Sequence, residues 1–115
     1  MSEIVCRAVD CCLRVMDFVG SRSPNELSET MTSEIQARLQ KVVHMLQGFE
    51  KTALLKTRKG REAAQEIEGA AMNLEKALGS LELGDPSPFM ESLLMLEQHI
   101  NELQRTIERL KRVVT

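Results

Sequence analysis

The sequence predicts an all-α protein, an antiparallel four-helix bundle built from residues 1–115 as a single helical domain. Two observations predict this fold. Glycine and proline together number nine, too few for an all-β domain with many turns. Apolar residues recur in steps of three and four along most of the chain, as they do on one face of a helix. The helices are expected at about residues 2–19, 25–57, 61–82 and 88–114.

Composition narrows the classes of function. A content of 43% hydrophobic residues and a formal net charge of −2 indicate a folded chain rather than a disordered one or a globally basic nucleic-acid binder. The chain has no Trp or Tyr and only three Phe residues, so it offers few rings on which bases could stack. We therefore do not expect a nucleic-acid partner.

The first expected helix, residues 2–19, carries one narrow charged stripe. Its charged residues recur in steps of four and three and alternate in sign, so that neighbours along the stripe attract. They are Glu3, Arg7, Asp10, Arg14 and Asp17. The other positions after Ser2 are apolar, and we expect this helix to need cover on nearly every side. Gly20 is expected to end it.

Three cysteines, Cys6, Cys11 and Cys12, lie in this first helix, and the rest of the chain has none. Their number and spacing fit neither a disulfide framework nor a zinc site, so we interpret them as small apolar residues of a buried helix. The charged stripe argues against a signal peptide and a membrane span. We expect a cytoplasmic protein that binds no metal or other cofactor and no membrane.

The second helix is expected to begin at a capping box, Ser23–Glu26, in which Pro24 takes the first helical position. Residues 56–62 contain no apolar side chain and predict a turn, with Gly60 as the residue that ends the helix. An alternative stays open, because the apolar seam keeps its phase across this turn. In that alternative, helices two and three form one long helix in an oligomer.

Proline and glycine mark the end of the third helix. The segment 83–88 contains two prolines spaced by one residue, which a helix interior does not accept. We expect Ser87 to cap the fourth helix, with Pro88 at its first position. The fourth helix then carries a regular seam of Leu and Ile in alternating steps of three and four.

One segment of the second helix has a pattern typical of phosphoryl chemistry. On a helix, His44 points away from the apolar seam, and Gly48 lies on the same face one turn later, where it lets another surface approach. Lys41 and Lys51 flank the imidazole and are placed to stabilise a phosphoryl group on it.

The segment His-Met-Leu-Gln-Gly at 44–48 resembles the site of the histidine phosphotransfer domains, H-x-L-K-G on the second helix of a four-helix bundle of about this length. Gln47 stands where that family has lysine. The resemblance implies a phosphotransfer protein whose site residues are His44, Lys41, Gln47, Gly48 and Lys51.

The leading hypothesis for function is a non-catalytic protein–protein interaction module of the adaptor, export-chaperone or assembly-factor type. No catalytic motif is present, so we do not expect an enzyme. The first and fourth helices carry more apolar surface than one small bundle needs, and flexible methionines suit adaptable contacts. A partner protein or a second copy would cover the candidate interface residues Val5, Val9, Met16, Met90, Leu94 and Met95.

The basic run Lys56, Arg58, Lys59 and Arg61 permits two interpretations. A charged, solvated hairpin tip is one, and a surface for an acidic partner or a nucleic acid is the other. The second predicts binding that weakens steeply as salt is added.

Overall fold

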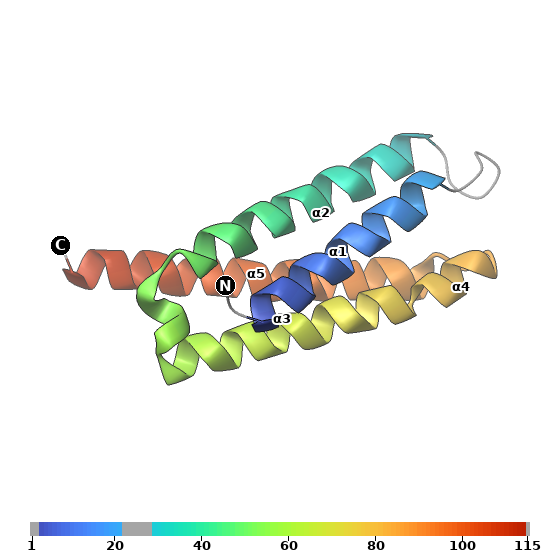
Figure 1. The fold of residues 1–115 in the computed structure, drawn as a ribbon. Helices are drawn as coiled ribbons and strands as arrows, with labels where there is room; N and C mark the ends of the chain where they lie inside the picture. Colours follow the sequence, from blue (N-terminus) through green and yellow to red (C-terminus); the bar gives the residue numbers. More distant parts are fainter. Residues whose placement is uncertain (1–2, 22–28, 115) are drawn as a thin grey trace.

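The computed structural model describes residues 3–21 and 29–114, which form an elongated helical bundle of 51 × 23 × 21 Å (Figure 1). Two short helices lie in the connections between four long ones. In chain order the elements are α1 (Glu3–Ser21), α2 (Glu29–Glu50), the 3₁₀ helix η1 (Ala53–Lys56), α3 (Arg58–Lys76), α4 (Leu78–Glu82) and α5 (Ser87–Val114). The described residues contain no strand, and the predicted all-α bundle is confirmed.

Helix α1 lies between α2 and α3 and contacts both, and α3 in turn packs against α5 (Figure 1). Two ion pairs join α1 to α3 and show how the two helices are aligned. Arg7 Nε lies 3.3 Å from Glu68 Oε1, and Arg14 Nε lies 3.1 Å from Glu75 Oε1. Both pairs join residues 61 apart in sequence, so α1 and α3 run in the same direction.

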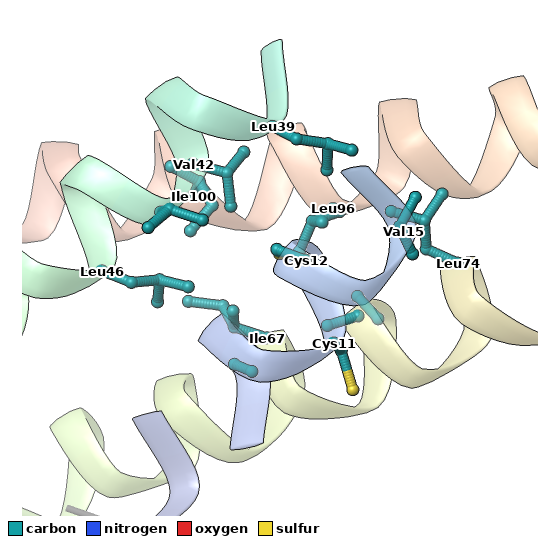
Figure 2. Close-up of a cluster of buried hydrophobic side chains, with 14 of the residues drawn as sticks. Cys11, Cys12, Val15, Leu39, Val42, Leu46, Ile67, Leu74, Leu96 and Ile100 are labelled. Carbon is teal, nitrogen blue, oxygen red and sulfur yellow. The ribbon is translucent and has the colours of Figure 1, made fainter. Parts of the chain in front are cut away.

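The core is one cluster of apolar side chains supplied by all four long helices, as Figure 2 shows for its central part. No polar or charged residue is buried among the described residues. Cys11 and Cys12 belong to this core, which confirms their interpretation as buried apolar residues, and Cys6 is half-buried. The charged stripe of α1 faces solvent as predicted.

The cover that α1 needs comes from within the bundle. Its buried residues are Val5, Ala8, Cys11, Cys12, Val15 and Val19, and they pack in the common core. Leu13 keeps 43% of its surface exposed. The expectation that α1 carries a broad surplus of apolar surface is therefore wrong, because its neighbours α2 and α3 bury most of that surface.

The first helix does not end at Gly20, because α1 continues through Ser21. Gly20 instead lets the side chain of Gln36 lie close to the backbone of α1. A Cβ atom there would lie 2.7 Å from Nε2 of Gln36, whose side-chain amide donates to the carbonyl of Met16 at 3.4 Å. The predicted capping box at Ser23–Glu26 lies outside the described residues.

The connection between α2 and α3 is a turn at residues 51–57, earlier than predicted. Helix α2 ends at Glu50, where the Thr52 hydroxyl donates to the carbonyl of Phe49 at 2.7 Å and competes with the helical bond. Thr57 then caps α3, since its Oγ1 accepts from the Gly60 amide at 3.0 Å.

Gly60 is therefore in the first turn of α3 and does not end α2, which corrects the prediction. The fused-helix alternative is not the arrangement of this chain either. Thr52 and Thr57 both have an extended backbone with ψ of 157°, which separates η1 from the helices on each side.

The third predicted helix is interrupted at Ala77, so that α3 and α4 are separate. The chain stops after α4 as predicted, in a Schellman motif: Gly84 has φ of +86°, and Asp85 N donates to Ser80 O at 3.0 Å. Ser87 is the first residue of α5 rather than its cap. The Asp85 carboxylate supplies the capping bond by accepting from Ser87 N at 3.2 Å.

Candidate functional site

The phosphotransfer candidates lie together on the solvent side of α2 and its end. His44, Lys41, Gln47, Gly48 and Lys51 are all exposed. A Cβ atom placed on Gly48 would meet nothing within 4 Å, so the surface one turn from His44 is open. The structure therefore leaves all five residues open to solvent.

The six predicted interface residues divide into three groups. Val5 is only 1% exposed and belongs to the core, so its prediction as an interface residue is wrong. Its side of α1 is the one that the bundle covers. Val9, Met16 and Met90 are half-buried and pack against the core.

Leu94 and Met95 remain open, with exposed fractions of 52% and 57%. They are consecutive residues on the outer side of α5, and we call this pair the α5 ridge. Leu94 borders a groove between α2 and α5, and Met95 borders another between α3 and α5. Gly69 of α3 lines the second groove, and a Cβ atom placed on it would meet nothing within 4 Å, so a partner can approach closely there.

The predicted basic run contributes to a cavity of about 540 Å³ between η1, the start of α3 and α5. We call this cavity the basic groove. Its less exposed lining includes Leu54, Ala63 and Leu103. Its charged lining residues are Arg58, Lys59 and Arg109, all of them exposed, and Thr57, Gly60 and Thr106 complete it. Lys56 and Arg61 are exposed but do not line it.

Sequence reasoning missed the contribution of α5 to this groove. Arg109 and Leu103 lie more than forty residues from the basic run, and only the packing of α3 on α5 brings the two segments together. The concentration of basic residues near the end of α5 was a visible signal, but it is equally explained by the negative end of a helix.

A further cavity of about 420 Å³ lies between α1 and α3 and is lined in part by Cys11. Arg14 donates to Cys11 Sγ at 3.4 Å and also binds Glu75. Burial raises the pKa of Cys11, and the hydrogen bond from Arg14 lowers the pKa of Glu75. A thiol with a raised pKa stays protonated at neutral pH and is a poor nucleophile.

Burial raises the pKa of the Cys12 thiol to about 12, in keeping with its place in the apolar core. Across residues 3–21 and 29–114 no three His, Cys, Asp or Glu side chains are grouped so that they could hold a metal ion. Over the same residues, none of the helices has both the length and the apolar character needed to cross a bilayer.

Comparison of the chain with protein-family models, with curated proteins and with solved structures gives no match.

Proposed function

We propose that this protein is a non-catalytic, all-helical protein–protein interaction module of the adaptor, export-chaperone or assembly-factor type. The observation that carries the proposal is the α5 ridge, where Leu94 and Met95 expose more than half of their surface side by side. Grooves on both sides of the ridge give a partner surface room to interlock with it.

The energy available at the ridge supports a contact of this kind. Full burial of a Leu or Met side chain contributes about 1.5–3 kcal/mol, so covering the exposed half of each contributes on the order of 1 kcal/mol. Met95 adapts its three rotatable bonds to different partner surfaces. Of the charged side chains that line the groove beside Leu94, Arg38 and Glu97 bind each other, with Arg38 Nε donating to Glu97 Oε2 at 2.9 Å. Lys41 is the third and adds one positive charge beside the ridge.

The partner is either another protein or a second copy of this chain, in a reducing compartment such as the cytoplasm. The test is site-specific photo-crosslinking in cells, with a photoreactive residue at position 94 or 95, and at exposed Gln65 of α3 as the control. We expect discrete adducts from the ridge positions and none from position 65. An adduct of twice the chain mass identifies a second copy, and any other discrete mass identifies a different partner.

Light scattering and a hydrophobic dye give the complementary result. A protein that is monomeric at high micromolar concentration, binds no dye and gives no adduct at position 94 or 95 would remove the proposal. The variant Leu94→Glu/Met95→Glu should lose the adduct or the dimer while its helical content stays unchanged, because both side chains already face water.

A second candidate function is histidine phosphotransfer through His44. The observation that favours it is the open surface at Gly48, one turn from an exposed imidazole with Lys41 and Lys51 on either side. Incubation with a phosphorylated receiver domain should then give an acid-labile phosphohistidine, and His44→Gln should abolish it. Half-buried His99 is not a matched control, because its Nδ1 lies 3.8 Å from Glu66, so wild type without receiver serves instead. Absence of transfer to the wild type ends this alternative.

A further inference from the structure

We infer that the basic groove binds an acidic amphipathic segment of another protein, with aliphatic side chains packed on Leu54, Ala63 and Leu103 and carboxylates paired with the cations around them. This adds a second surface, different in chemistry from the α5 ridge. It shares with the proposed function only the premise that the partner is a protein, and no ridge residue takes part in it.

The shape and lining of the groove carry the first step. Its volume of about 540 Å³ lies within the range of about 300–1,000 Å³ that is usual for ligand sites. Leu103 is buried and Leu54 is half-buried at its base, so an apolar side chain placed there loses contact with water. An amphipathic helix uses apolar anchors one turn apart to fill a groove of this kind.

The charge of the groove carries the second step. Its lining includes three cations, Arg58, Lys59 and Arg109, and no acidic residue. Arg58 is held by Glu62 of the next turn at 3.2 Å, whereas no ion pair of Lys59 or Arg109 is found within the part of the chain that the structure describes. Carboxylates of a partner would therefore meet cations that have no competing partner there.

The charge of the whole chain strengthens this step. Residues 51–61 contain five basic residues and no acidic one, whereas the remainder contains ten basic and seventeen acidic residues. The hairpin end is thus the positive end of an otherwise acidic molecule, and it attracts acidic segments while the rest repels them. The amino end of α3 adds its partial positive charge at the same place.

The wall of the groove that η1 and α3 form is closely packed, which is the third step. A Cβ atom at Gly60 would lie 1.8 Å from the carbonyl oxygen of Leu54, so η1 sits directly on the first turn of α3. Thr57 closes this contact by accepting from the Gly60 amide and donating to Leu54 O at 2.7 Å. A site that is already formed loses little entropy when a peptide binds.

A peptide fits this surface better than a nucleic acid or a membrane does. Single-stranded nucleic acid needs exposed rings for stacking, but Phe49 and Phe89 are buried and Phe18 is half-buried. A membrane surface takes up apolar side chains that protrude, whereas Leu54, Ala63 and Leu103 line a concavity. Only an amphipathic acidic segment uses both the cations and the apolar base.

The experiment is a selection from three displayed peptide libraries that share apolar residues at helical spacing and differ in their other positions, which are acidic, neutral or basic. We expect enrichment from the acidic library alone. Selected peptides should bind Lys59→Glu/Arg109→Glu at least tenfold more weakly than wild type. The matched control Lys76→Glu/Arg105→Glu carries the same change in net charge at exposed residues that do not line the groove and should stay within twofold.

An uncharged variant tests the apolar base. Ala63→Leu places a larger side chain in the groove and should weaken the binding of the same peptides at least fivefold, with its helical content and thermal midpoint measured alongside.

Three outcomes of these experiments overturn the inference: no enrichment from the acidic library, equal enrichment from all three libraries, or equal loss of binding in the control variant. The inference is also overturned if phosphatidylserine vesicles or a single-stranded oligonucleotide displace the selected peptides from the wild type and do not bind Lys59→Glu/Arg109→Glu. That result would indicate a general polyanion surface. None of these outcomes affects crosslinking at the α5 ridge.

Discussion

The hairpin between α2 and α3 requires a residue without a side chain at position 60. The carbonyl oxygen of Leu54 occupies the place where its Cβ would lie, at 1.8 Å, and this oxygen belongs to backbone that cannot rotate away. The sequence singled out Gly60 but assigned it to the end of the preceding helix. Composition alone does not distinguish a glycine that ends a helix from one that lets a neighbouring backbone approach, since both positions exclude a side chain.

Gly60→Ala should therefore destabilise the protein by about 1–3 kcal/mol, the usual cost of overpacking. Gly69→Ala is the matched control on the same helix, because a Cβ there meets nothing within 4 Å. It should stabilise by about 0.5–1 kcal/mol through helix propensity. Urea unfolding of both variants at low micromolar concentration measures the difference, and equal stabilities would contradict the close approach.

Cys12 gives a prediction about pH. Burial raises the pKa of its thiol to about 12, whereas a thiol in the unfolded chain ionises near pH 8.5–9. Above that pH the unfolded state has lost a proton that the folded state keeps, so the free energy of unfolding falls as the pH rises towards 12. The loss approaches about 1.4 kcal/mol per pH unit.

Cys12→Ala removes this ionisation and should show a shallower loss of stability between pH 9 and 11 than wild type. The comparison concerns the slope, because the smaller side chain also lowers the overall stability by leaving a cavity. Denaturant unfolding at a series of pH values measures both slopes, and parallel curves would show that the thiol ionises as easily in the folded protein.

At the scale of the elements, sequence patterns predicted which segments are helical but not where each helix ends. The four long helices follow from apolar periodicity, which extends over many residues. The ends depend on single side-chain hydrogen bonds, such as that from Thr52 to Phe49 O and that from Ser87 N to Asp85. Many Thr and Asp residues offer such bonds, and only the packed structure shows which ones form.

The connection between α4 and α5 depends on the left-handed conformation of Gly84, with φ of +86°. Gly84→Ala should cost about 1–2 kcal/mol, because a Cβ is unfavourable in this region, and Gly84→Asn should cost less. Gly79→Ala in α4 is the control, since Gly79 has ordinary backbone angles and open space around it. Thermal unfolding measures the three variants, and a Gly84→Ala variant as stable as the Gly79→Ala control would contradict the motif.

At the scale of the whole molecule, the apolar content of a helix predicted its burial but not which molecule buries it. The sequence placed Val5 and Leu94 in one class of interface residues, yet Val5 packs within the bundle and Leu94 does not. The difference arises from which helices are neighbours: α1 has a helix on each of two sides, whereas the outer side of α5 has none among the described elements. The basic groove likewise depends on contact between segments distant in sequence.

The hairpin at residues 51–57 also determines whether one chain closes its own bundle. The apolar seam keeps helical phase through Lys56 and Gly60, so a continuous helix from α2 into α3 is compatible with the side-chain pattern, and the cap at Thr57 and the contact at Gly60 favour the turn. Thr57→Ala/Gly60→Ala removes the cap and obstructs the turn, while alanine favours the helix.

An open hairpin separates α1 and α2 from α3 and α5, and a second copy restores the lost contacts by exchanging the same helices. We therefore expect the double variant to shift towards twice the wild-type mass at high micromolar concentration, measured by light scattering. The control Thr30→Ala/Gly69→Ala makes the same two replacements at exposed helical positions that do not line the basic groove and should keep the wild-type mass. If the double variant keeps its helical content and its mass does not change with concentration, then contacts other than Thr57 and Gly60 hold the turn, and the packing of half-buried Leu54 and Leu55 on the core becomes the stronger cause.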